Sequence, residues 1–290
     1  MTSYPALVVC GVDPELVLAA ADDYSPSAAE PLENGVRLFF RTSDQRDGAG
    51  LAITSAWPHA VVDRLTVDDD GWAARSQENL PAVTVGALIL VSAASMNPSD
   101  RSSEPDHRAP SAQTASTPTH VLVIQPSTGF GTGHHASTRL CLAALQTLDL
   151  HGRVVLDVGT GSGVLAIAAG MLGATRTVGI DDDPDAVRAA RENLSLNPSA
   201  LGVAIEEIDL TRGALPRADV VLANLTGALL QRAAPLLLAA AADSGHLVVS
   251  GVLREERSAV MSAFAPARLV WDAAEDEWAG MIFQTARKNL

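Results

Sequence analysis

Short apolar runs alternate with segments of helical spacing through the second half of the chain. Each run ends at a polar residue or a glycine, and apolar residues recur at helical intervals in the segments between the runs. Regular alternation of strand and helix predicts a parallel sheet with right-handed crossover connections. The expected strands are 154–158, 177–181, 203–208, 219–223 and 246–251, and the expected helices are 164–172, 184–194, 226–242 and 255–264.

Two further strands are expected at the end of the chain, over 268–272 and 278–284, joined by an acidic turn at 275–277. Two strands joined this closely form an antiparallel hairpin. The pattern therefore predicts an α/β fold with a seven-stranded, Rossmann-like sheet. In such a sheet a ligand binds at the carboxyl ends of the parallel strands.

The first 91 residues have a different pattern and predict a small α+β domain. Asp13 is expected to cap a short helix in which Pro14 is the first residue. The turn-rich segment 42–50 is expected to separate two strands. The full set of expected elements is strands at 6–10, 36–40, 51–54 and 86–91, an unplaced β-like run at 61–67, and a helix at 71–80.

Residues 92–119 consist mainly of Ser, Pro, Thr, Ala and Asp, with almost no large apolar side chains. Such a segment cannot bury enough apolar surface to offset the entropy lost on ordering. We therefore expect a flexible linker or a long surface loop, followed by a second domain over 120–290.

The formal net charge of −14 argues against a nucleic-acid-binding surface, which needs a basic stripe. An acidic body suits a basic protein partner, although solubility alone also explains it. The two cysteines, Cys10 and Cys141, lie too far apart in sequence to suggest a disulfide framework or a metal site. No signal peptide is evident, so we expect a cytoplasmic protein. The apolar stretch 221–242 is broken by polar residues and Pro235, so we do not expect it to span a membrane. We also expect a monomer.

A strand that leads into three alternating glycines and then a helix is the most informative local feature. Gly159, Gly161 and Gly163 allow positive φ angles and close backbone approach, and the turn directs the free N–H groups of the helix toward a ligand. Asp157 precedes the turn, and Asp181 ends the next strand, 22 residues after Gly159. A dinucleotide fold places a ribose-binding carboxylate at about that separation.

The dinucleotide fingerprint G-x-G-x-x-G would need a glycine where this chain has Val164. The pattern G-x-G-x-G, with an acid two residues before it, instead resembles motif I of class I S-adenosylmethionine-dependent methyltransferases. A Rossmann-like fold that binds another nucleotide is the alternative.

A second glycine-rich stretch, 125–140, places Thr132, His134 and His135 in a tight loop, and Ser137 is expected to cap the helix that follows. The adjacent histidines do not predict a metal site, because neighbours in sequence usually point apart and no third ligand is evident.

Three stretches resemble the bacterial ribosomal protein L11 methyltransferases, namely 130–138, 156–169 and Leu222–Thr226. The resemblance extends from about residue 130 to 283 and is faint before residue 71. Two positions differ from the usual family motif: His134 stands where threonine is usual, and Ala136 where proline is usual.

This resemblance implies S-adenosylmethionine-dependent N-methylation of amino groups, either a lysine side chain or the N-terminus, of ribosomal protein L11, with substrate recognition by the N-terminal domain. Gly159, Gly161 and Gly163 would admit the methionine part of the cofactor. Asp157 would hold the glycine-loop backbone or, through water, the cofactor's amino group, and Asp181 would accept from the ribose hydroxyls. Asp209 would bind the adenine amino group or serve only as a turn residue, and Asn224 would accept from the incoming amine. Thr132 would help the loop to close over the cofactor, and His135 would position the substrate or structure the loop.

Three other functions compete with this one. The same chemistry could serve another protein or a small amine. A nicotinamide-dependent oxidoreductase is disfavoured by Val164, and a non-catalytic module is disfavoured by the combined presence of the glycine turn, Asp181 and Asn224.

Overall fold

The computed structural model describes residues 3–24, 26, 28–32, 34–40, 42–68, 82–93, 120–125, 135–209 and 215–287. The chain divides into two compact units, the first within Met1–Glu78 and the second within Asn79–Gln125 and Gly131–Leu290. No helix in the described parts of the chain is long and apolar enough to cross a membrane.

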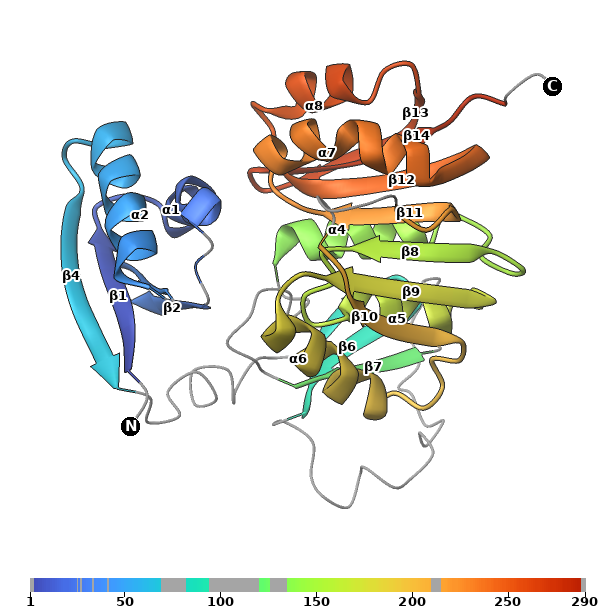
Figure 1. Ribbon diagram of the computed structural model, residues 1–290, viewed down its shortest axis with the longest axis horizontal. Helices are drawn as coiled ribbons and strands as arrows, with labels where there is room; N and C mark the ends of the chain where they lie inside the picture. The colour runs from blue at the N-terminus through green and yellow to red at the C-terminus, as the bar shows by residue number, and fades with distance from the viewer. Residues whose placement is uncertain are drawn as a thin grey trace, which may run out of the picture. The chain divides into compact units, whose positions relative to one another are not determined.

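The first unit is a four-stranded antiparallel sheet in the order β2-β3-β1-β4, with its helices packed together against the sheet (Figure 1). Its core joins Leu7 and Val9 of the central strand to Val17 and Ile53 of the two helices. The elements are β1 (Ser3–Cys10), α1 (Pro14–Ala21), the 3-10 helix η1 (Asp22–Tyr24), β2 (Ala28–Leu32), β3 (Gly35–Phe39), α2 (Ser43–Ala56) and β4 (Val61–Asp68).

Helix α2 corrects the sequence-based expectation of a turn at 42–50 and a strand at 51–54. Its start is a capping box: Thr42 Oγ1 accepts from the Gln45 N–H at 3.3 Å, and the Gln45 side chain accepts from the Thr42 N–H at 3.2 Å. These two bonds satisfy backbone donors that a helix start leaves free. Strand β2 was not predicted, whereas the helix after Asp13 is confirmed, with Asp13 Oδ1 accepting from the Glu15 N–H at 2.9 Å.

Strands β5 (Val83–Val85), β6 (Leu88–Ser92) and β7 (His120–Ile124) form a small separate sheet. Because β6 pairs in parallel with β7, these residues belong to the second unit, and the expected domain boundary at residue 91 does not coincide with the observed division. The partner strand lies about thirty residues further along the chain, too far for a local pattern to indicate the pairing. The helix expected at 71–80 and residues 94–119 of the expected linker lie outside the described residues.

The second unit contains the expected seven-stranded sheet, and the α/β fold is confirmed (Figure 1). The strand order is β10-β9-β8-β11-β12-β14-β13; the first five strands run parallel, and β14 is antiparallel to both of its neighbours. The strands are β8 (Val154–Val158), β9 (Arg176–Asp181), β10 (Val203–Glu207), β11 (Ala218–Asn224), β12 (Ala241–Leu253), β13 (Arg268–Glu275) and β14 (Trp278–Gln284).

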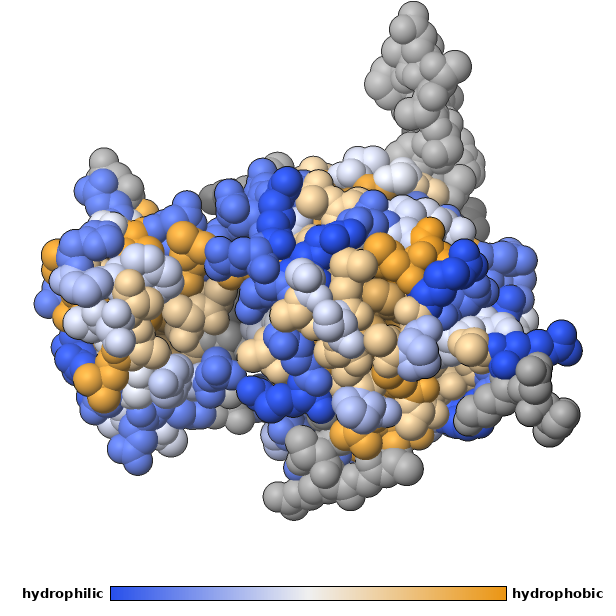
Figure 2. Space-filling model, turned by 90° about the horizontal axis from the view of Figure 1, so that it is seen from above, coloured by the Kyte–Doolittle hydropathy of each residue, from blue (hydrophilic) through white to orange (hydrophobic). Residues whose placement is uncertain are grey.

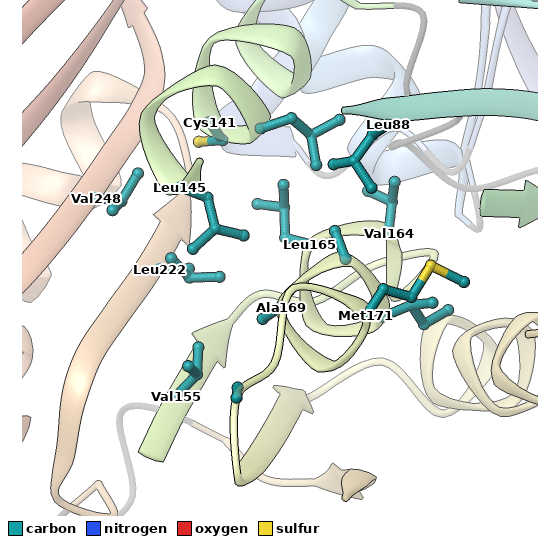
Figure 3. Packing of buried hydrophobic residues seen from close by; sticks show 14 of the residues in the cluster. Leu88, Cys141, Leu145, Val155, Val164, Leu165, Ala169, Met171, Leu222 and Val248 are labelled. Carbon is teal, nitrogen blue, oxygen red and sulfur yellow. The ribbon is translucent and has the colours of Figure 1, made fainter. Parts of the chain in front are cut away.

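Helices cover both faces of this sheet, which is why its central strands are apolar on both sides. On one face, side chains of α4 and α5 pack against Val155, Leu222 and Val248, and Leu88 of β6 joins the same cluster (Figure 3). On the other face, α7 and α8 pack against residues that include Leu156 and Val221. The helices are α4 (Ala136–Leu145), α5 (Val164–Met171), α6 (Pro184–Ser195), α7 (Gly227–Ala240) and α8 (Arg257–Ala263).

The surface mixes apolar and polar residues, as the face in Figure 2 shows. Within the described residues, the large apolar side chains that are exposed come from five different segments, and scattered residues of this kind are normal on protein surfaces. They are Leu51, Val61, Val121, Leu201 and Val270.

Candidate functional site

The carboxyl ends of β8 and β11 mark the point where the direction of winding of the sheet reverses. From β8 the chain proceeds outward through β9 and β10, and it then returns to β11 on the other side of β8. Ligands of open α/β sheets bind outside the strand ends at such a point. Asp157, Asp181 and Asn224 lie in the last residues of β8, β9 and β11.

The glycine turn after β8 adopts a backbone that other residues rarely adopt, with φ of +68° at Gly159, +53° at Gly161 and +81° at Gly163. A side chain at Gly159 would come within 2.5 Å of the Leu225 side chain, and one at Gly163 within 3.0 Å of Ala190 Cβ. Gly163 caps α5, so the turn leads directly into the helix whose first N–H groups can receive a ligand.

Asp157 is buried beneath this turn. Its Oδ2 accepts from the Thr160 hydroxyl at 2.6 Å and from the Ala166 N–H at 3.1 Å, so one carboxyl oxygen joins the turn to α5. Its Oδ1 is buried without a hydrogen-bond partner among the described residues. Burial raises the pKa of Asp157 to about 7, although the bonds from Thr160 and Ala166 favour the charged form.

The raised pKa makes the burial of Asp157 a pH-dependent cost to stability. The same carboxyl in the unfolded chain has an ordinary pKa of 3.8, so between these two values the folded state binds more protons than the unfolded state. The contribution of Asp157 to the free energy of unfolding therefore falls as pH rises from about 4 to about 7, and the loss is complete above that range.

Between pH 5 and pH 8, we expect the free energy of unfolding of the wild type to fall by roughly 2–3 kcal/mol more than that of Asp157→Asn, because asparagine does not titrate. Urea unfolding at several pH values measures this difference. Asp182→Asn, a change at an exposed neighbouring carboxyl, is the control and should keep the wild-type pH dependence. Parallel stability curves for Asp157→Asn and the wild type would contradict the prediction.

Asp181 lies half-buried between the glycine turn and the start of α6. Its Oδ2 accepts from the Gly161 N–H at 2.9 Å, and its Oδ1 accepts from the Asp183 N–H at 3.1 Å. Burial raises its pKa, these two N–H groups oppose the rise, and the charges of Asp182 and Asp183 add to it. The structure thus brings Asp181 into direct contact with the glycine turn. The ribose-binding role that its spacing from Gly159 suggested stays a prediction.

Asn224 ends β11, and its Nδ2 donates to the Thr138 hydroxyl in the first turn of α4 at 3.3 Å. The Leu225 N–H donates to the Ser250 carbonyl of β12 at 3.1 Å, which holds the strand ends together. Gly251, with φ of +80°, leaves room for this approach: a side chain there would come within 2.4 Å of the Leu225 carbonyl oxygen and 3.1 Å of Asn224 Oδ1.

His135 is the N-cap of α4, which corrects the expectation that Ser137 has this role. Its Nδ1 accepts from the Ser137 N–H at 3.3 Å and lies 2.8 Å from the Ser137 hydroxyl oxygen. The ring also makes an edge-to-face contact with Trp278, with 4.6 Å between centroids. Of the two roles considered for His135, substrate positioning and loop structure, these contacts favour loop structure.

Asp209 and Thr132 are the two remaining residues that the sequence assigned to the site. Asp209 lies two residues beyond the end of β10, next to Ile208, whose N–H donates to the Asp181 carbonyl at 2.9 Å. Thr132 lies outside the described residues, as do His134 and residue 130. Within the described part of the chain, no group of three His, Cys, Asp or Glu side chains is arranged to hold a metal ion.

The motifs at this site agree with a comparison against known families. A sequence model of the family described as ribosomal protein L11 methyltransferase (PrmA) matches residues 52–286, which is most of the chain. The chain belongs to this family. Its resemblance to the family, first indicated by three short stretches, is thereby confirmed.

Individual members of the PrmA family show how far the similarity extends. The ribosomal protein L11 methyltransferase of Geobacter sulfurreducens is 46% identical over 167 residues, which cover 57% of this chain and 54% of that protein. The corresponding protein of Pelobacter propionicus is 36% identical over 265 residues, covering 89% of this chain and 78% of that protein. The chain spans about half the length of several such curated relatives that it matches.

A solved structure supports the fold. The ribosomal protein L11 methylase of Lactobacillus delbrueckii subsp. bulgaricus superposes with a TM-score of 0.59 at 22% identity, covering 71% of this chain and 99% of that one.

Sequence reasoning missed Thr138 as a residue of this site. It is the last residue of the 130–138 stretch that resembles the PrmA family, and that stretch was the available signal. Its contact with Asn224 spans 86 residues of sequence and became apparent only from the fold.

Proposed function

We propose that the protein is an S-adenosylmethionine-dependent N-methyltransferase that modifies amino groups, a lysine side chain or the N-terminus, of ribosomal protein L11. The observation that carries this proposal is the convergence of the glycine turn, Asp181 and Asn224 at the carboxyl ends of adjacent strands. Membership of the PrmA family supports it.

The residues present fit the polar groups of S-adenosylmethionine. The start of α5 offers N–H groups to the methionine carboxylate. Asp157 Oδ1, which is buried and has no hydrogen-bond partner among the described residues, can accept from the amino group directly or through water. Asp181 is a suitable acceptor for the ribose hydroxyls, and we keep Asp209 as the candidate acceptor for the adenine amino group. When bound, S-adenosylmethionine supplies an electrophilic methyl group on a positively charged sulfur.

The amine that accepts the methyl group must be uncharged, whereas a lysine with pKa of about 10.4 is protonated in neutral water. Removal from water lowers that pKa. Because Asn224 Nδ2 donates to Thr138, its Oδ1 is the atom left to accept a hydrogen from the amine and to direct the lone pair toward the methyl group. The departing sulfur is neutral, so the reaction needs no general acid.

The first unit is the part of the protein that we assign to substrate recognition, and the net charge of −14 suits a basic partner. We keep closure over the cofactor as a prediction for Thr132. A ribosomal protein as substrate implies activity in the cytoplasm.

Intact-mass spectrometry of ribosomal protein L11, incubated with this protein and S-adenosylmethionine, tests the proposal. We expect added multiples of one methyl mass with the wild type, and far less added mass in the same incubation time with Asn224→Ala. No added mass from a wild-type protein that binds S-adenosylmethionine would exclude L11 and direct the search to another protein lysine or a small amine. No binding would contradict the methyltransferase assignment itself.

A further inference from the structure

Asn193 in the last turn of α6 and Asn197, two residues beyond the end of that helix, are almost fully buried: Asn193 is 1% exposed and Asn197 is 2% exposed. Buried amides are costly unless they are hydrogen-bonded, and both of these are. The Asn193 Nδ2 donates to the Ser162 carbonyl at 2.9 Å, and its Oδ1 accepts from the Gln125 N–H at 2.7 Å. One side chain therefore joins the glycine turn to the residue that follows β7.

Asn197 has a similar environment but different partners. Its Oδ1 accepts from the Val123 N–H at 2.8 Å, and its Nδ2 donates to the Val123 and Asn193 carbonyls, each at 2.7 Å. Strand β6 pairs with one edge of β7. On the other edge, where no strand of the described chain pairs, the Asn197 side chain binds the N–H and carbonyl of Val123. None of these bonds involves the glycine turn.

The position of Asn193 follows from a close approach between α6 and the turn. Gly163 lies against Ala190, where an added Cβ would come within 3.0 Å, and Asn193 lies one helical turn further along α6. Ser162 stands between two glycines, the residues with the greatest backbone freedom. A hydrogen bond to its carbonyl therefore restrains the part of the turn that has the largest choice of conformations.

We infer that Asn193 is a positioning residue for cofactor binding, which holds the Ser162 carbonyl so that the glycine turn stays in its binding conformation. This inference rests on the proposed function. The same side chain also connects the residue after β7, which precedes the 130–138 motif, to the turn in the 156–169 motif. If the turn is less often in its binding conformation, apparent affinity falls in proportion.

Asn193→Asp and Asn197→Asp form a matched pair. Each variant keeps an acceptor for the backbone N–H that the amide oxygen now binds. Because burial raises the pKa of a carboxyl, both variants are measured at alkaline pH, where the carboxylate has lost the amide's donor. We expect Asn193→Asp to weaken S-adenosylmethionine binding about tenfold, and Asn197→Asp to change it by less than about twofold. Calorimetry measures both affinities, and thermal unfolding shows whether the two variants are equally destabilised.

Two further measurements separate positioning from a general structural role. At saturating S-adenosylmethionine, the kcat of Asn193→Asp should stay near the wild-type value while the KM for S-adenosylmethionine rises, because Asn193 contacts the turn and has no bond to Asn224. Hydrogen exchange of peptides that cover 159–164 should become faster in Asn193→Asp and remain unchanged in Asn197→Asp. If Asn193→Asp does not fold, Asn193→Ser supplies the same readouts.

Equal losses of affinity in the two variants, or unchanged exchange of the glycine turn in a folded Asn193 variant, would overturn the inference. Failure of the proposed function is distinguishable, because a wild-type protein that does not bind S-adenosylmethionine contradicts that function directly. The exchange experiment needs no ligand, so it still decides whether Asn193 orders the turn.

Discussion

Replacement of Asn224 by alanine is expected to lower the rate of methyl transfer by roughly 100-fold, the scale of losing one oriented polar contact to a reacting group. The affinity for S-adenosylmethionine should change by less than about threefold, since the proposed partner of Asn224 Oδ1 is the amine. Single-turnover kinetics gives the first quantity and calorimetry the second. Similar losses in rate and affinity would contradict a substrate-facing role for Asn224.

Thr138→Val tests the same arrangement from the other side. Valine has nearly the shape of threonine but cannot accept the hydrogen bond from Asn224 Nδ2, so the amide is no longer held in one orientation. We expect a smaller loss of transfer rate than with Asn224→Ala, about tenfold, because Asn224 Oδ1 remains present. A Thr138→Val protein with wild-type kcat would show that the 3.3 Å contact does not orient the amide for catalysis.

Replacement of Asp181 by alanine is expected to weaken S-adenosylmethionine binding by 100-fold or more, about the value of two charge-assisted hydrogen bonds. Two effects combine. The acceptor proposed for the ribose hydroxyls is lost, and the Gly161 N–H loses the carboxylate that restrains the glycine turn.

Asp182→Ala is the matched control, because it removes the same charge from the adjacent, exposed position. We expect its affinity to stay within about threefold of the wild type, since exposed charges act weakly at a distance in salt solution. Thermal unfolding of both variants distinguishes a loss of affinity from a loss of folding, because Asp181→Ala also removes the acceptor of the Gly161 and Asp183 N–H groups. Unchanged calorimetric affinity in Asp181→Ala would exclude the ribose role.

Some expectations failed even though a local signal was present. The segment 42–56 has little apolar periodicity, so its turn-forming residues suggested a loop and a strand. The Thr42–Gln45 capping box was nevertheless readable in the sequence, and it marks the start of α2. The cap of α4 failed for a related reason: Ser137 is the commoner capping residue, but the helix begins at Ala136 and His135 takes that position.

Other features had no local signal. The pairing of β6 with β7 moves residues 83–92 into the second unit, and it depends on Leu88 and Leu90 being buried against α4 and α5. The partners of Asn193 are equally remote, because Ser162 and Gln125 lie 31 and 68 residues away in sequence. Helical spacing alone placed Asn193 on α6 without indicating that its amide would be buried.

The sequence by itself determined the seven-stranded α/β fold, the glycine turn and the placement of Asp157, Asp181 and Asn224 at strand ends. These features follow from alternation, from glycine's access to positive φ and from the polarity of single positions, all of which neighbouring residues specify. Only the tertiary structure decided which side chains meet: Asn224 with Thr138, Asp181 with Gly161, and Asn193 with the glycine turn. Such pairs depend on how helices pack across the sheet, because a polar group that is wholly or partly removed from water binds the hydrogen-bond partner that packing brings within reach.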